Sequence, residues 1–403
     1  MSRAPITLNN PARFAGTHTI AKEKLEAAAK AACDKLRAKA LEFKNNGGEI
    51  GLDFPGTCSV EHKYVRGENK NWECGMYSGC YWLAYELTGD EFFREIAEAH
   101  LPTFRGRVDN RIGMDDHDVG FVFTPSCIAA YKLTGNEFAK QAALDAAAHE
   151  FKYNYTTKGK FIIRFHGGWD KGPGCRTMMD SLMNAPLLFW AGKESGNEEY
   201  FKAGHDHNLT TEKYLIREDS SSYHHYQFDP ATAGPLHGVT LQGNSNESCW
   251  ARGHSWGIYG FPIAYSYTND PVLKAVHKDI TCFMLNHLPE DNIPYWDYDF
   301  TEGDEPRDSS SGAISSCGLH EMARLLPDSD PDKKLFENAA AILLEAIIDN
   351  CTGDIGKDYD GLITHVTHAK PQGQGIDESA AYGDYFYLEA LLRHLKPDWN
   401  RYW

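Results

Sequence analysis

Residues 81–100 read YWLAYELTGDEFFREIAEAH, and this stretch holds the pattern that decides the fold. An apolar helical segment ends at Gly89, Asp90 follows it, and a second amphipathic segment begins. Glycine favours the left-handed backbone that ends a helix, and an aspartate side chain accepts hydrogen bonds from the first amides of the next helix. The stretch therefore predicts two helices joined by a tight turn, a helical hairpin.

The same pattern recurs along the chain. It returns as CIAAYKLTGNEFAKQAALDA at 127–146, LLFWAGKESGNEEYFKAGHD at 187–206 and IAYSYTNDPVLKAVHKD at 263–279. A looser copy, HEMARLLPDSDPDKKLFENAAAILLEA, spans 320–346, and ALLRHLKPD at 390–398 resembles a truncated last copy. The clearest junctions are Gly89-Asp90, Gly135-Asn136, Gly196-Asn197 and Asn269-Asp270. Before these copies, apolar residues at helical spacing predict one more amphipathic helix over about 20–43.

About six helical hairpins can form an open solenoid or a closed ring. Solenoid repeats keep a uniform period of roughly 34 to 47 residues, whereas the junctions here are 46, 61 and 73 residues apart. Extra length in loops between repeats favours an all-α fold, an (α/α)6 toroid whose loops crowd one rim. We expect a single catalytic domain over 1–403, with 1–17 as an N-terminal extension and a short β-hairpin in the loop around 220–245.

Composition limits the partners. The 403 residues carry a formal net charge of −17, and a strongly acidic surface repels nucleic acids and anionic membranes. Ten cysteines without a CxxC pair indicate reduced, packed thiols. The N-terminus lacks the apolar core of a signal peptide, so we expect a cytoplasmic protein; an export signal on a trimmed precursor stays possible and the oligomeric state stays open.

Polar residues are in phase with the repeat. Trp72, Asp118, Asp180 and Arg252 each stand 16 or 17 residues before a junction. Equivalent positions in successive repeats of a ring lie at one height, so these side chains should converge at the N-terminal ends of the inner helices. Any one aspartate at a helix start is more often an N-cap. Here four repeats carry chemically different polar or aromatic side chains at the equivalent position, and this combination favours a functional site.

Four blocks carry a resemblance to a known family. MDDHDVGFVFTPS (114–126), CRTMMDSLMNAPLLFW (175–190), SCWARGHSWGIYGF (248–261) and YGDYFYLEALLR (382–393) resemble the unsaturated glucuronyl hydrolases of glycoside hydrolase family 88. The similarity runs from about Trp72 to the C-terminus. The related unsaturated rhamnogalacturonyl hydrolases share the toroid and are kept as an alternative, although HDVGF followed by WARGHSW fits the glucuronyl family better.

The resemblance implies an unusual hydrolysis without a cofactor or metal. Such enzymes hydrate the C4=C5 double bond that polysaccharide lyases leave on a non-reducing uronate, and the resulting hemiketal opens and expels the rest of the sugar. The substrates would be unsaturated uronyl disaccharides or short oligosaccharides, derived from glycosaminoglycans. Asp180 matches the general acid/base, and Asp118 matches a second essential carboxylate.

The resemblance also implies the binding residues. Trp72 and Trp256 match indoles that stack on sugar faces, and Arg252 matches an arginine of the site. The other matched positions are His117, His224 and Gln242 near the unsaturated ring, Gly238 and Thr240 in the glycine-rich loop GVTLQG, and Thr364 and Thr367 in THVTHAK, where the family varies in recognising the second sugar or its sulfate.

Two other functions stay open from the residues alone. A sugar epimerase or isomerase on a similar toroid would use paired histidines, and His224-His225 keeps that alternative open. A non-catalytic sugar-binding protein would need only the aromatic residues and Arg252. The aspartates of DDHD (115–118) resemble the metal-binding clusters of all-helical enzymes that act on prenyl diphosphates. Such enzymes also need a second metal-binding motif and basic residues that contact phosphate, and the sequence shows neither.

Overall fold

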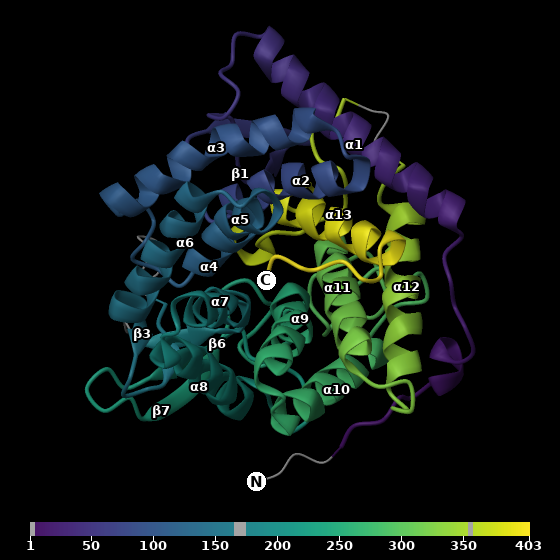
Figure 1. Cartoon of the computed structure of the whole chain (residues 1–403). Helices are drawn as coiled ribbons and strands as arrows, with labels where there is room; N and C mark the ends of the chain where they lie inside the picture. Colours follow the sequence, from purple (N-terminus) through teal and green to yellow (C-terminus); the bar gives the residue numbers. More distant parts are fainter. Residues whose placement is uncertain (1–4, 165–174, 354–357) are drawn as a thin grey trace.

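The computed structural model describes residues 5–164, 175–353 and 358–403, and helices dominate these ranges. Along the chain the helices alternate between an outer and an inner ring (Figure 1). The outer ring comprises α1 (Lys22–Asn45), α3 (Glu91–Asn110), α6 (Glu137–His149), α8 (Glu198–Leu215), α10 (Pro271–Asn286) and α12 (Lys333–Asn350). The inner ring comprises α2 (Glu73–Thr88), α4 (Val119–Phe123) continued by η2 (Thr124–Ile128) and α5 (Ala129–Thr134), α7 (Pro186–Ser195) preceded by η4 (Met179–Met183), α9 (Ala251–Thr268), α11 (Ser309–Leu325) and α13 (Ala381–Leu395).

The two ends of the chain close the ring. Each inner helix packs against the next, and α13 packs against both α11 and α2. Helix α1 packs on α13, so the first and last helices form the sixth hairpin. The segment 390–398, which resembles a truncated copy in the sequence, is therefore completed by an outer helix from the other end of the chain. The predicted (α/α)6 toroid is confirmed.

The predicted junctions have the backbone that their residues favour. The residues that end four inner helices have left-handed φ values of 71°, 69°, 71° and 53°, at Gly89, Gly135, Gly196 and Asn269 respectively. The side chain that follows each of them accepts a backbone N–H of the next outer helix, in Asp90, Asn136, Asn197 and Asp270. The fifth junction lacks this geometry, because α11 ends at Leu326 with an extended backbone.

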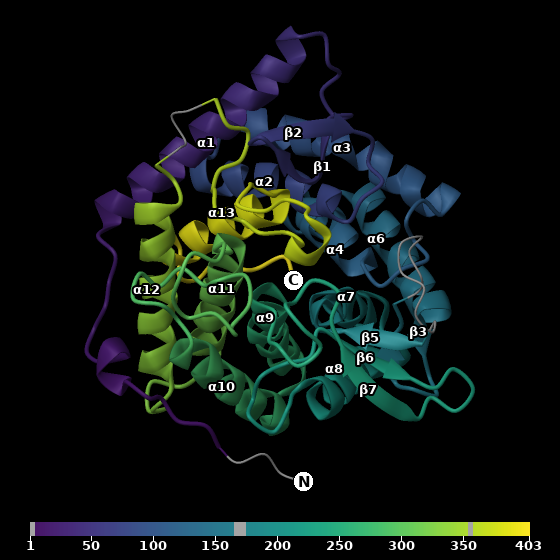
Figure 2. The same ribbon diagram turned by 180° about the vertical axis from the view of Figure 1, so that it is seen from behind.

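Short strands lie on one face of the ring, the face that is in front in Figure 2. The strands β5 (Arg176–Met178), β6 (His225–Phe228) and β7 (Pro235–Val239) form an antiparallel sheet. Two smaller hairpins consist of β1 (Phe54–Val60) with β2 (Lys63–Gly67) and β3 (Tyr155–Thr156) with β4 (Phe161–Ile162). The hairpin expected around 220–245 is the pair β6–β7.

The C-terminal tail closes the barrel at the C-terminal ends of the inner helices. The Trp403 ring stacks on Phe386 with centroids 6.0 Å apart, and its Nε1–H donates to Glu389 at 2.9 Å. Arg401 donates to Glu321, near the end of α11, at 2.6 Å. The chain end consequently lies at the centre of the ring in both views (Figures 1 and 2). With this end plugged, the cavity of the ring opens toward the N-terminal ends of the inner helices.

The N-terminal segment crosses the outer ring. Phe14, in η1 (Pro11–Phe14), is buried among residues of α10 and α12. Asn338 of α12 donates to the carbonyls of Phe14 and Gly16 at 2.9 Å each. The first four residues of the expected extension lie outside the described residues.

All ten cysteines are unpaired thiols, and nine of them are buried. Within the described ranges, no helix combines the length and the apolar character needed to cross a membrane.

Candidate active site

A cavity of about 440 Å³ lies at the N-terminal ends of the inner helices. Helices α4 and α9 and the η4 turn contribute residues to its wall, Trp72 lies directly before α2, and loops from other parts of the chain complete the wall. The lining residues are Thr57, Trp72, Asp116, His117, Asp118, Phe121, Arg164, Met178, Asp180, Leu241, Gln242, Trp250, Arg252, Trp256, His368, Ala369, Gln372 and Gln374.

The four in-phase residues meet in this cavity. Trp72 and Asp118 precede the first residues of α2 and α4, Asp180 lies in η4, and Arg252 is the second residue of α9. The starts of α11 and α13 carry serines, Ser309 and Ser379, which do not line the cavity. They donate to the carbonyls of Thr364 and Ile363, at 2.7 Å each, and so hold the loop before α13.

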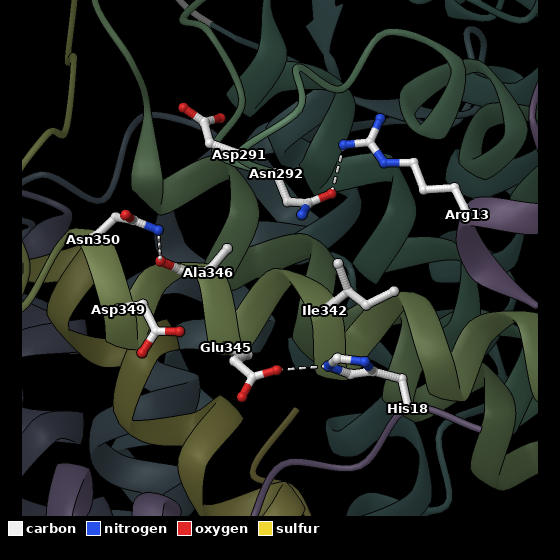
Figure 3. Close-up of a pocket in the computed structure, with 9 residues that line it drawn as sticks. All are labelled: Arg13, His18, Asp291, Asn292, Ile342, Glu345, Ala346, Asp349 and Asn350. Carbon is white, nitrogen blue, oxygen red and sulfur yellow. Dashed lines mark hydrogen bonds and ion pairs between the residues drawn. The ribbon is translucent and has the colours of Figure 1, made fainter. Parts of the chain in front are cut away.

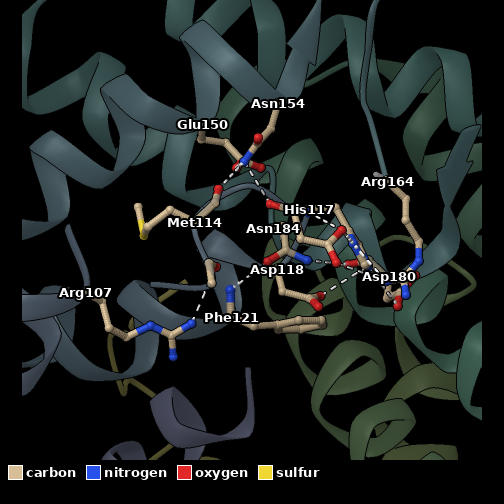
Figure 4. Close-up of polar contacts among 12 residues, drawn as sticks. Arg107, Met114, His117, Asp118, Phe121, Glu150, Asn154, Arg164, Asp180 and Asn184 are labelled. Atoms are coloured by element: carbon tan, nitrogen blue, oxygen red, sulfur yellow. Dashed lines mark hydrogen bonds and ion pairs between the residues drawn. The ribbon is translucent and has the colours of Figure 1, made fainter. Parts of the chain in front are cut away.

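One histidine lies among three carboxylates at the wall of the cavity (Figure 4). The Nε2 atom of His117 is 3.2 Å from an oxygen of Asp118 and 3.4 Å from an oxygen of Asp180. Its Nδ1 atom is 2.7 Å from Asp116. An imidazole with carboxylates on both nitrogens is held as a doubly protonated imidazolium, so the cluster joins Asp118 and Asp180 through one positive charge.

The surroundings of the two carboxyl groups shift their pKa values in opposite directions, up for Asp118 and down for Asp180. Burial opposes the charge of His117, but Asp118 and Asp116 outweigh it and raise the pKa of His117 to about 10. Burial raises the pKa of Asp118 to about 6, against the attraction of His117 and with the help of the charges on Asp116 and Asp180. Burial also acts to raise the pKa of Asp180, but its hydrogen bond to His117 and the charge on that ring hold the pKa below its ordinary value. The pair therefore retains a proton on Asp118 to higher pH than on Asp180.

The same cluster has the composition of a metal site. Ligand atoms of Asp116, His117 and Asp118 lie within 4.8 Å of one another. A metal would need an unprotonated nitrogen from the histidine, so it would have to displace a proton from His117, whose pKa Asp118 and Asp116 raise to about 10 against the effect of burial.

Indole and phenyl rings form the apolar part of the cavity wall. Trp72 stacks on Tyr382 with centroids 5.1 Å apart and an interplanar angle of 17°. Phe121 packs against both Trp72 and Trp256, with centroids 5.1 and 5.0 Å apart. Trp72 is half-buried, whereas Trp256 is almost fully buried. Trp72 has more surface for a sugar face, and Trp256 has a larger share in packing.

Arg252 holds the wall of the cavity together. One Nη nitrogen donates to Asp308 and to the carbonyl of Thr367, both at 2.7 Å, and the other donates to the carbonyl of His368. Its guanidinium also lies over the Trp250 ring, 4.6 Å from the centroid. Three of its five N–H groups are thus committed to the protein, and two remain for a ligand.

His224 supports the loop 240–243 from behind. The backbone N–H groups of Leu241 and Gln242 point to its Nδ1 at 3.2 and 3.3 Å, so the proton of this neutral ring belongs on Nε2. Burial lowers the pKa of His224 to about 3, which keeps the ring neutral. Gln242 lines the cavity and donates to the His368 carbonyl at 2.9 Å.

The structure places neither His224 nor the remaining predicted residues on the cavity surface. A Cβ at Gly238 would lie 2.2 Å from the Tyr223 ring, so this glycine makes room for a side chain of the protein. Thr240 caps its own loop by accepting the Gly243 N–H at 2.8 Å. The hydroxyls of Thr364 and Thr367 donate to the carbonyls of Cys351 and Arg307, at 3.2 and 2.8 Å.

The expected sulfate-recognition segment is internally paired. Lys370 forms an ion pair with Glu305 and lies over the Trp296 ring, 5.0 Å from the centroid. His365 pairs with Asp377 at 2.6 Å. A sulfate at this rim would therefore compete with a carboxylate of the protein for Lys370.

Several lining residues were missed by the sequence analysis. Asp116 lies two positions before Asp118, and Trp250 belongs to the in-phase cluster at the start of α9, so the repeat could have indicated both. Arg164 and Gln374 come from loops outside the hairpin pattern, and no periodicity marks such positions.

A second hollow, of about 390 Å³, lies between the N-terminal segment and α12 (Figure 3). Its carboxylates form ion pairs within the protein: Nζ of Lys24 lies 2.9 Å from Glu345 and 2.7 Å from Asp349, and Arg307 lies 2.9 Å from Asp291. Nε2 of His18 also lies 2.7 Å from Glu345.

Comparison with known proteins places this site in a known context. A sequence profile of Glycosyl Hydrolase Family 88 matches residues 54–387. The unsaturated chondroitin disaccharide hydrolase of Streptococcus pyogenes serotype M1 is 40% identical over 397 residues, which cover 98% of this chain and 97% of the relative.

Solved structures agree with this similarity. The crystal structure of unsaturated glucuronyl hydrolase from Streptococcus agalactiae has a TM-score of 0.93 and 37% identity, and each chain is covered completely. A variant of that protein complexed with dGlcA-GalNAc6S has a TM-score of 0.86 and 35% identity over the full length of both chains.

Proposed function

Because the chain belongs to Glycosyl Hydrolase Family 88, we propose that it hydrolyses unsaturated uronyl disaccharides derived from glycosaminoglycans, by adding water to their C4=C5 double bond. The observation that carries this proposal is the joint position of Asp118 and Asp180, both beside Nε2 of the His117 imidazolium and in one cavity with Trp72. Two carboxylates with divided pKa values suit a reaction that needs an acid and then a base.

The reaction adds one water molecule in two proton transfers. The carboxyl of Asp180 donates a proton to C4, and positive charge develops at C5 and the ring oxygen. Water then attacks C5 and gives its proton to the Asp180 carboxylate, which regenerates the acid. The C5 hemiketal opens by breaking its bond to the ring oxygen, and C1 then expels the second sugar and becomes an aldehyde. The acid/base is thus one residue used twice.

The proton for the first step comes from the carboxylate pair. In the ligand-free protein Asp118 keeps its proton to a pKa of about 6 while the pKa of Asp180 is lowered. A bound uronate adds a negative charge and excludes water, and both effects favour the protonated form of Asp180. Asp118 and His117 are therefore assigned the tuning of Asp180, and Asp118 additionally the contact with sugar hydroxyls.

The walls of the cavity provide the binding groups. Trp72 offers a ring face to the sugar, and flat apolar sugar surfaces pack on such rings. Gln242 and Arg252, which line the cavity, are proposed to contact the unsaturated ring. His224, whose Nε2 is buried, is proposed to act through the loop 240–243 that its Nδ1 holds. Trp256 supports this wall from the core side.

Loss of the ultraviolet absorbance of the conjugated double bond tests the proposal. The protein is incubated with lyase-generated unsaturated disaccharides of chondroitin, hyaluronan and heparin. Hydration removes the absorbance, whereas an isomerase that acts elsewhere on the sugar, or a protein that only binds it, leaves the absorbance unchanged. Unchanged absorbance with the whole panel would overturn the proposal.

Asp180→Asn tests the assignment of the acid/base. We expect kcat to fall about 10³-fold, because a positioned proton donor contributes roughly 10² to 10⁴ to a rate, while the melting temperature stays within a few degrees. Asp270→Asn is the matched control, since Asp270 caps α10 just after the C-terminal end of α9 and does not line the cavity. Near-normal turnover by Asp180→Asn would contradict the assignment.

A further inference from the structure

The first turn of α4 is capped differently from those of α3, α6, α8 and α10, in each of which the N-cap side chain accepts a backbone N–H of its own helix. Asp118 occupies the N-cap position of α4, but its side chain accepts no hydrogen bond from that helix. Its ψ angle is 9°, whereas the capping residues of α3, α6, α8 and α10 have ψ between 101° and 117°. An aspartate at this position normally caps the helix with its own carboxylate. Here the backbone of Asp118 turns the carboxylate toward His117 instead.

The cap comes from the neighbouring hairpin. Oδ1 of Asn184 accepts the backbone N–H of Phe121, the third residue of α4, at 2.7 Å (Figure 4). Nδ2 of the same side chain donates to the carbonyl of Asp180 at 3.2 Å. Asn184 is fully buried. One amide thus satisfies a helix-start N–H on one segment and a carbonyl on the segment that carries the second carboxylate.

A glycine permits this close approach. A Cβ at Gly120 would lie 2.4 Å from both Cα and the carbonyl oxygen of Asn184. These are backbone atoms, which cannot yield as the end of a flexible side chain can. Gly120 therefore lets α4 and the η4 turn pack backbone to backbone, at the distance that the Asn184 bridge needs.

We propose that Asn184 is a positioning residue: it caps α4 in place of Asp118, and thereby frees the Asp118 carboxylate for the active site and fixes its distance from Asp180. This inference deepens the proposed function and rests on it for its kinetic consequences. The geometric part, that Asn184 substitutes for the cap, stands on hydrogen bonds alone.

The exchange of caps has an electrostatic consequence. A carboxylate that accepts an N–H at a helix start is stabilised in its charged form, so capping would lower the pKa of Asp118. Without that bond, burial raises this pKa to about 6. The charged groups that face Asp118 are Asp116, His117, Asp180 and Arg164 around the cavity, with Glu73, Arg107 and Glu150 farther into the protein. All of these groups remain in an Asn184 variant. A shift in the pKa of Asp118 in such a variant would therefore come from the change in helix capping.

Two variants of Asn184 and one control test the proposal by the pH dependence of kcat/KM. In Asn184→Ala the Phe121 N–H loses its acceptor and can donate to the Asp118 carboxylate instead. The pH above which kcat/KM declines (the alkaline limb) should then be lower by about one unit. We expect kcat to fall about 10- to 100-fold, because small displacements of catalytic groups have such effects, with KM changed less than about threefold. Asn184→Asp keeps the acceptor for Phe121 and adds a negative charge, so its limb should move to higher pH.

Asn338→Ala is the matched control. Asn338 is a buried asparagine that also bridges backbone groups, in the outer helix α12. Its loss should lower the melting temperature without moving the limb. An unmoved limb in Asn184→Ala, or a limb of Asn184→Asp displaced to lower pH, would overturn the proposal. The second criterion applies even if Asn184→Ala does not fold.

A crystal structure of Asn184→Ala separates this proposal from the proposed function, because it needs no turnover. We expect the Asp118 carboxylate within hydrogen-bond distance of the Phe121 nitrogen. A carboxylate that stays against His117, with the Phe121 N–H bound to water, would refute the exchange of caps even in an active enzyme.

Discussion

At the scale of single residues, His117 decides how the two carboxylates share their charges. It lies within 3.4 Å of both Asp118 and Asp180. The charge of Asp118, together with that of Asp116 at 2.7 Å from the other ring nitrogen, keeps the ring protonated against the effect of burial. The positive ring lets two acidic groups lie together in a buried cavity, which they could not do as bare anions.

The pH dependence of kcat/KM follows from this cluster. The proposed reaction begins with a proton on the carboxylate pair, and the pKa of about 6 at Asp118 marks where the pair loses it. The required proton is present below this pKa and lost above it, so kcat/KM should fall about tenfold per pH unit above roughly pH 6. Initial rates from pH 4 to 9, read from the absorbance of the double bond, check this. A kcat/KM that stays constant to pH 8 would contradict it.

The sequence could indicate Asp118 and Asp180 because their repeats place them at one phase. It could not show what Arg252 contacts, because its partner Asp308 is 56 residues away, in another hairpin. Nor could the sequence show that the pKa of Asp118 is raised while that of Asp180 is lowered. Burial acts to raise the pKa of Asp180, whereas the hydrogen bond and the charge of His117 lower it, and their balance depends on distances of a few ångströms.

At the scale of elements, the inner helices are held in register by polar contacts at their N-terminal ends. The ion pair between Arg252 of α9 and Asp308, which precedes α11, is almost fully buried. Asn184 does the same for α4 and the η4 turn. Residues near the site therefore serve the ring as well as a substrate.

Arg252→Ala should consequently destabilise the protein as well as weaken substrate binding. Removing one partner of a buried ion pair leaves the other charge uncompensated and costs about 3 to 5 kcal/mol, measured as the free energy of unfolding in urea. The double variant Arg252→Met, Asp308→Asn should recover more than half of the loss, because it leaves no unpaired charge. If Arg252→Ala raised KM with unchanged stability, the structural role would be wrong.

Helix junctions were the most predictable elements. Gly89 and Asn269 are residue types that favour a left-handed backbone, and both adopt it. The junction after α11 is not marked in this way, and its helix ends at Leu326 without a left-handed residue. The sixth hairpin escaped the pattern because its helices, α1 and α13, lie at opposite ends of the sequence.

At the scale of the whole molecule, the plug at one end of the ring supports the site at the other. The Trp403 ring lies edge-on to Phe121, with centroids 6.2 Å apart, and Phe121 packs in turn against Trp72 and Trp256. The chain end and the aromatic wall of the cavity are thus connected through one aromatic core.

Trp403→Ala should therefore weaken both stability and binding. Truncation of a buried tryptophan costs about 3 to 5 kcal/mol, and the cavity that it leaves should let Phe121 shift and raise KM. Calorimetry and kinetics on the variant measure the two effects. Trp399→Ala is the control, because that indole packs on Tyr402 and donates to Glu86. It should lower stability with an unchanged KM, and an equal rise in KM for both variants would contradict the link through Phe121.

The most direct test of the account is a crystal structure of the Asp180→Asn protein with an unsaturated disaccharide. The account predicts the unsaturated ring in the cavity at the N-terminal ends of the inner helices, its C4 about 3 to 4 Å from the side chain at position 180, and one sugar face against Trp72. A disaccharide bound elsewhere, or a ring whose double bond points away from both position 180 and Asp118, would contradict it.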